Sequence, residues 1–196
     1  MSTKLLASAL LITSLWVLGS NSLIAEQQAV SRVVPVGDKE KSLAAFQSIL
    51  KVLKSPRCMN CHPSGDVPRQ GDDQHLHRMG VSRGKADHGG LVQKCETCHH
   101  QENNLYANVP GAPHWGLAPR SMGWQGLSDL ELGKALVDKN KNGGRSPQDL
   151  VKHMGQDSLV LWAWNPGPGR TPPPVPLPEF RAALNEWLNN GAHVPQ

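Results

Sequence analysis

Four cysteines and two histidines stand in two short patterns of the same kind, and these are the residues best suited to chemistry. The patterns are Cys58-Met59-Asn60-Cys61-His62 and Cys95-Glu96-Thr97-Cys98-His99. On a helical turn, residues three and four apart lie on one face. Two thiols at this spacing can form thioether bonds to one porphyrin edge, and the adjacent histidine can reach the iron. Cys-x-x-Cys-His is the attachment signature of c-type haem, so the sequence predicts two covalently bound haems.

The same cysteines allow two other interpretations. Two Cys-x-x-Cys pairs can hold a zinc ion in a four-cysteine tetrahedral site, or they can be disulfides or redox pairs. All four cysteines of the chain sit in these pairs, and a histidine follows each pair at once, which a four-cysteine zinc site does not require. Haem is therefore favoured, with thioether bonds from Cys58, Cys61, Cys95 and Cys98 and with His62 and His99 as iron ligands.

An iron that only carries electrons also needs a second axial ligand, and His77 is one candidate for it. It lies 15 residues after His62, which is far enough for the chain to fold over a porphyrin. His75 lies in the same segment and is an alternative ligand. We prefer His77 because it is one of the residues that match the family resemblance described below. The main alternative ligand is Met122, whose thioether would raise the reduction potential.

His153 is the second candidate for an axial position. It is predicted to lie on a capped helix, from which it can face the interior. Asp149 and Asp157 are each four residues away and can accept its other ring proton, as the partners of metal-bound histidines do. We predict that His77 and His153 bind iron, without assigning either to one of the two irons.

Residues 1–25 have the pattern of a secretory signal. An apolar run follows Lys4, and small residues then allow cleavage after Ser22 or Ala25. An uncleaved anchor helix is the alternative, but the run of about 14 residues is shorter than the roughly 20 that span a bilayer. Because bacteria attach haem covalently outside the cytoplasmic membrane, the expected location is the periplasm.

The charge balance does not indicate a nucleic-acid-binding protein. The 196 residues contain 20 basic and 16 acidic side chains, for a formal net charge of +4. The basic residues are scattered and are not interleaved with aromatic residues, which is typical of a solvated surface. The carboxylates of two haems would also offset much of this charge.

The elements that must position the motifs are predicted to be short helices and long loops, with no clear strand. Residues 26–41 are expected to be a flexible arm, and residues 42–54 an amphipathic helix that Pro56 ends. Residues 63–90 are expected to form a loop without regular elements that wraps a cofactor.

Three further helices are expected near the end of the chain. They are predicted from Ser128 to Lys139 behind a capping box, from Ser146-Pro147 onward, and from Pro178 to Asn189. Trp115 and Trp124 are expected to form walls beside the porphyrins. Residues 42–196 are thus predicted to be one mostly α, dihaem cytochrome c-like domain wrapped around two haems.

These motifs resemble those of class-I-like dihaem cytochromes c. From about residue 58 to residue 195 the chain is also similar to small proteobacterial haem proteins described as isoquinoline 1-oxidoreductase subunits. That resemblance implies association with an exported molybdenum hydroxylase or aldehyde dehydrogenase. One departure is Val194-Pro195, where the likeness would have Cys-Pro. The likeness rests on Cys58–Pro63, His77, Arg83-Gly84, Cys95–His99, Pro110–Pro113, Asn142–Arg145, His153 and Leu161–Gly167.

Electron transfer is the function that the sequence favours, because haem iron is the only credible chemistry in it. The expected partners are a periplasmic dehydrogenase, a terminal oxidase or another cytochrome, with no small-molecule substrate and no nucleic acid. One alternative is a dihaem peroxidase-like enzyme, which needs acid and base groups such as Glu96, Glu102 or His100 beside an open iron. Another is a haem-based sensor, which needs an output domain.

Overall fold

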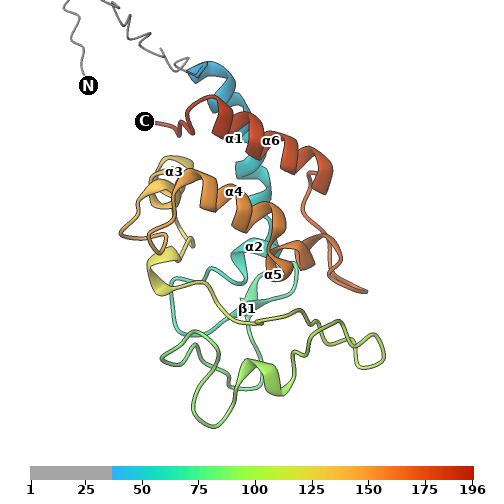
Figure 1. The fold of residues 1–196 in the computed structure, drawn as a ribbon. Coiled ribbons are helices and arrows are strands. Elements are labelled where there is room, and N and C mark those ends of the chain that lie inside the picture. Colours follow the sequence, from blue (N-terminus) through green and yellow to red (C-terminus); the bar gives the residue numbers. More distant parts are fainter. Residues whose placement is uncertain (1–36) are drawn as a thin grey trace, which may run out of the picture. The chain divides into compact units, whose positions relative to one another are not determined.

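The computed structural model describes residues 37–196 as a mostly helical unit with very little sheet (Figure 1). The predicted signal segment 1–25 and residues 26–36 of the predicted arm lie outside the described residues. Within residues 37–196, no helix combines the length and the apolar character needed to cross a membrane. The helices are α1 (Lys39–Leu53), α2 (Pro56–Met59), α3 (Asp129–Val137), α4 (Pro147–Gln156), α5 (Ser158–Leu161) and α6 (Leu177–Asn189). Short 3₁₀ turns cover Cys95–Thr97, Arg120–Met122 and Trp162–Trp164, and the strands are β1 (Arg69–Gln70) and β2 (His75–Leu76).

The hydrophobic core lies where α1, α4 and α6 meet. Helix α1 runs beside α6, and α6 also packs on α4 (Figure 1). The rings of Phe46 and Trp187, with centroids 5.8 Å apart, join α1 to α6 at the centre of this contact. Ile49 and Leu184 are also fully buried there. The apolar faces predicted for the first and last helices therefore pack against each other.

The first helix begins and ends differently from the prediction. It begins at Lys39 because the carboxylate of Asp38 accepts hydrogen bonds from the backbone amides of Glu40 and Lys41. Residues 39–41 are thus helical and do not belong to an arm. Pro56 does not end this helix but opens α2, since a proline at the first helical position loses no hydrogen bond. This second helix presents Cys58.

The long segment 63–90 contains one small regular element that the sequence did not predict. Strands β1 and β2 pair antiparallel, with Gln70 opposite His75. Buried Arg83 then fixes the rest of the segment, because its guanidinium donates to the carbonyls of Pro63 and Ala118 and pairs with Asp87. A loop without a hydrophobic core of its own is thereby held in one conformation.

Shortening Leu184 to Ala is expected to lower the free energy of unfolding by about 2–5 kcal/mol, because this fully buried side chain would leave a cavity. The matched control is Leu105→Ala, whose side chain is 68% exposed and whose loss is expected within about 0.5 kcal/mol. Urea unfolding followed by circular dichroism measures both values. Equal losses in the two variants would contradict the packing of α6 described here.

Candidate functional site

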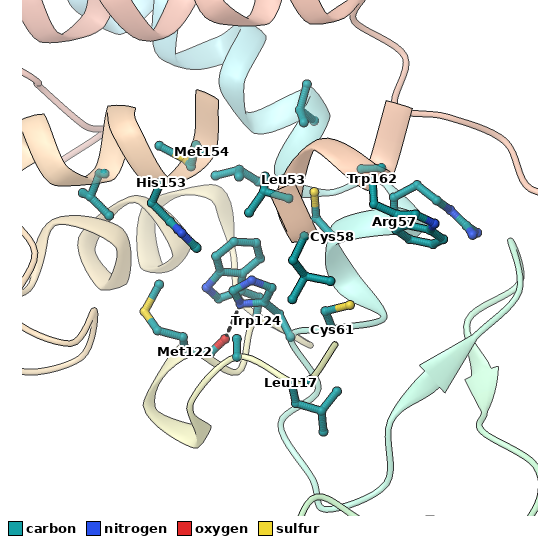
Figure 2. A pocket seen from close by; sticks show the side chains of 18 of the residues that line it. Leu53, Arg57, Cys58, Cys61, Leu117, Met122, Trp124, His153, Met154 and Trp162 are labelled. Carbon is teal, nitrogen blue, oxygen red and sulfur yellow. Dashed lines mark hydrogen bonds between the residues drawn. The ribbon is translucent and has the colours of Figure 1, made fainter. Parts of the chain in front are cut away.

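The first motif lies on α2 and the turn after it, at the wall of a cavity. Cys58 and Cys61 both line this cavity, and Figure 2 shows them on one side of it. Burial raises the pKa of the Cys58 thiol to about 12 and that of Cys61 to about 11. His62 completes the motif and lines the same cavity. Cys58, Cys61 and His62 therefore share one cavity, and Cys61 also lines the second.

One ring nitrogen of His62 is fixed and the other is left available. Its Nδ1 donates a hydrogen bond to the carbonyl oxygen of Met122 at 2.8 Å, the dashed line in Figure 2. Since a carbonyl only accepts, the proton lies on Nδ1, and Nε2 carries the lone pair that a metal ion needs. Burial lowers the pKa of His62 to about 3, so the imidazole is neutral at ordinary pH. Neutral imidazole is the form that binds metal ions.

The second motif repeats this arrangement with different partners. Its cysteines lie on and after the 3₁₀ turn Cys95–Thr97 and line a second cavity. The Nδ1 of His99 donates to the carbonyl oxygen of Pro110 at 2.7 Å. Burial lowers the pKa of His99 as well. Both motif histidines are thus neutral and have a free Nε2.

Each motif histidine is stacked on a tryptophan. The ring of Trp124 lies 3.4 Å from that of His62 with 13° between the planes, and the ring of Trp115 lies 4.5 Å from that of His99 with 9° between them. These are the two tryptophans that the sequence suggested as walls beside the porphyrins. In the structure they fix the rotation of the two imidazoles.

His77 faces His99 across the second cavity, which both residues line. Their ring centroids are 6.0 Å apart and their planes are at 75°. The Nδ1 of His77 donates to the carbonyl of Arg78, which leaves its Nε2 free. Because both rings keep a free Nε2 and line one cavity, His77 and His99 could together hold a metal ion placed between them.

His153 shares the first cavity with His62, and from α4 it points towards Trp124 in Figure 2. Its Nδ1 lies 3.6 Å from a carboxylate oxygen of Asp157, one of the two acids predicted to orient it. The alternative acid, Asp149, instead binds Ser146 in a capping box at the start of α4. The competing ligand, Met122, is buried and lines the same cavity.

Of the five remaining histidines, three line neither cavity: His75, His100 and His193. The Nδ1 of His75 bonds to Asp73 at 2.6 Å, and His75 lines neither of the two cavities. His88 and His114 do line the first cavity, although no local signal in the sequence set them apart from other loop histidines. The candidate peroxidase groups are exposed and line neither cavity; they are Glu96, Glu102 and His100.

The two cavities adjoin each other. The first has a volume of about 240 Å³ and the second about 540 Å³. The second volume is typical of a cofactor site, roughly 300–1,000 Å³. The first is smaller, and Trp124 stands in its middle in Figure 2, so a porphyrin there requires this ring to shift. Residues that line both cavities are Arg57, Cys61, Gly116, Leu117 and Trp162.

The lining of both cavities suits a large ligand that carries carboxylates. No acidic side chain lines either cavity, whereas Arg57 lines both. Three buried nitrogens that line them have no hydrogen-bond partner: Nε of Arg57, Nε of Arg69 and Nε1 of Trp124. A buried donor without a partner is costly. A porphyrin with two propionates would offer both apolar surface and acceptors, so the residues present fit haem.

Residues 37–196 contain no four-cysteine zinc site. All four thiols are free. Among residues 37–196, no three or more histidine, cysteine or acidic side chains converge as a closed metal site requires. The haem interpretation needs no such cluster, because its thiols bond to the porphyrin and only one or two imidazoles reach each iron.

Comparisons with protein-family models, with curated proteins and with solved structures find no match to this chain.

Proposed function

We propose that this chain is an exported dihaem c-type cytochrome that carries electrons and does not turn over a substrate. One observation carries the proposal: the two free thiols and the histidine of the first motif all line the first cavity, and those of the second motif all line the second cavity. Each of these histidines also has a free Nε2. When bound, haem supplies one-electron chemistry at its iron. Cys58 and Cys61 would hold the first haem and Cys95 and Cys98 the second, with His62 and His99 as iron ligands.

The second axial ligands follow from the two cavities. We assign His77 to the iron that His99 would hold, because the two residues line one cavity and their ring centroids are 6.0 Å apart. We assign His153 to the iron beside His62, because the two share a cavity and Asp157 can accept the other ring proton of His153. Two occupied axial positions suit an electron carrier, since they leave no iron position for a substrate.

Electrons would enter and leave at the second motif. Cys98 is exposed, whereas Cys58 and Cys61 of the first motif are partly buried. The loops that flank the second motif also carry fully exposed apolar side chains, among them Leu91, Val92 and Tyr106. The shared wall between the cavities would then let the two haems exchange electrons within the protein.

The proposed partners are redox proteins of the periplasm. Residues 1–25 supply the argument for export. The resemblance to isoquinoline 1-oxidoreductase subunits suggests a dehydrogenase, including molybdenum-dependent enzymes, as the electron donor. A terminal oxidase or another cytochrome would be the acceptor.

The reduced protein is expected to be oxidised by a soluble one-electron acceptor and to turn over hydrogen peroxide at less than about one per second, the low end of ordinary enzyme rates. The reason is that Glu96, Glu102 and His100 are exposed and line neither of the two cavities. Stopped-flow spectra and a peroxidase assay make the measurement. If the protein turned over peroxide at enzyme rates, the proposal of an electron carrier would be wrong and the dihaem peroxidase alternative would be supported.

A further inference from the structure

Arg57 is a buried cation between the two cavities. It stands directly before Cys58, is only 4% exposed and lines both cavities. Its Nη2 donates to the carbonyl of Gly71 at 3.1 Å and pairs with the carboxylate of Asp72. Its Nε is buried without any partner. A guanidinium in this position has unused capacity to bind an anion.

Asp72 does not balance the positive charge around it. The same carboxylate accepts hydrogen bonds from the amide and from the hydroxyl of Thr171, the latter at 2.6 Å. Arg170 lines the second cavity together with Arg57, and burial lowers its pKa. Its own guanidinium donates to the side chain and carbonyl of Asn108 and to the carbonyls of Pro166 and Pro168. The carboxylate of Asp72 is thus divided between Arg57 and Thr171.

The charge of the second cavity has the same sign throughout. Arg69 and Lys94 line it together with Arg57 and Arg170, and no aspartate or glutamate does. The Nε of Arg69 is a second buried donor without a partner. A buried donor without a partner is unfavourable, and a carboxylate that accepts two parallel N–H bonds is the ligand that best matches an arginine.

We infer that Arg57, with Arg170, binds a propionate carboxylate of the haem in the second cavity. This inference rests on the proposed function. Arg57 is a positioning residue here: it orients the porphyrin between His77 and His99. Its positive charge would also repel the oxidised, more positive state of the iron more strongly than the reduced state, and this would raise the reduction potential.

The experiment compares Arg57→Gln, Arg57→Lys and Arg170→Gln in the full-length holoprotein, with Lys51→Gln, an exposed cation on α1, as the matched control. Haem content is measured first, and the two midpoint potentials are then measured by spectroelectrochemistry. Arg57→Gln is expected to lower one potential by about 59 mV, a tenfold change for a one-electron couple. In Arg57→Lys the potential should fall by less than half of this amount, because the positive charge is kept. Arg170→Gln should lower the same potential by a smaller amount than Arg57→Gln does.

Two results would overturn the inference. One is a protein with two haems in which Arg57→Gln and Arg170→Gln shift neither potential more than Lys51→Gln does. The other is a saturable shift of the wild-type potential on addition of succinate, which would make this cluster a site for dissolved carboxylates. If Arg57→Gln does not fold, Arg170→Gln decides, because Arg170 is only partly buried. A wild-type protein without covalent haem would instead overturn the proposed function itself.

Discussion

The purified protein is expected to carry two covalently attached haems, and the double variant Cys58→Ala/Cys61→Ala is expected to carry one. Cys58 lines only the first cavity and Cys95 and Cys98 only the second, whereas Cys61 lines both. Because Cys58 and Cys61 belong to one motif, loss of this pair should remove both thioether bonds of one haem and neither bond of the other. Intact mass after denaturation measures this directly. The wild-type mass should exceed that of the processed polypeptide by two haems.

Two further proteins complete this test. Cys95→Ala/Cys98→Ala should also lose one haem, and its remaining haem should be the one beside His62. Leu105→Ala is the control, since this exposed side chain should not affect haem attachment. A wild-type mass equal to the bare polypeptide, or to polypeptide with zinc, would refute the haem proposal.

Replacement of His77 by alanine is expected to convert one of two low-spin haems to the high-spin form. The centroid of this ring lies 6.0 Å from that of His99, and among the described residues no other histidine lines the second cavity with them. Absorption and electron paramagnetic resonance spectra of the oxidised protein report the spin state. Only one of the two haems should change its spin state, because the substitution does not alter the first cavity.

His75→Ala is the matched control for this experiment. His75 is two residues away on the same hairpin, but its ring bonds to Asp73 and does not line the cavity. Both haems should therefore remain low-spin in this variant. Two low-spin haems in His77→Ala, or the loss of one in His75→Ala, would contradict the assignment of His77.

His153→Ala tests the other iron in the same way, and Met122→Leu separates the two candidates that share its cavity. His153→Ala should produce one high-spin haem, whereas Met122→Leu should leave both haems low-spin. A near-infrared sulfur-to-iron band in the wild-type protein would show methionine ligation and contradict the assignment of His153.

Features that depend on residues near one another in the chain could be predicted from the sequence. The spacing of Cys58, Cys61 and His62 follows from one helical turn. The capping box of Ser128 and Glu131 is confirmed, since each binds the backbone of the other across three residues. The mostly α class follows from these local signals, as does the amphipathic pattern of α1 and α6.

Two predictions from neighbouring residues were not met, because each residue can play a second local role. Pro56 was expected to end a helix, but the same lack of an N–H group also suits the start of one. Asp149 was expected to orient His153 from four residues away, but the hydroxyl of Ser146 is closer and binds it first. In both cases the residue type limited the possible roles, and the sequence did not show which role was adopted.

Only the tertiary structure decided which distant groups meet around each motif. The carbonyl partner of His62 is 60 residues away at Met122, and Asp72 binds Thr171 across 99 residues. His77 and His75 look alike in the sequence, and the hairpin alone turns His77 towards His99. Hydrogen bonds and ring contacts of this kind depend on distance in space, and chain spacing constrains that distance only within a helical turn or a strand. The two motifs and the candidate ligands His77 and His153 were therefore evident from the sequence, whereas the contact of His77 with His99 and the burial of Arg57 required the fold.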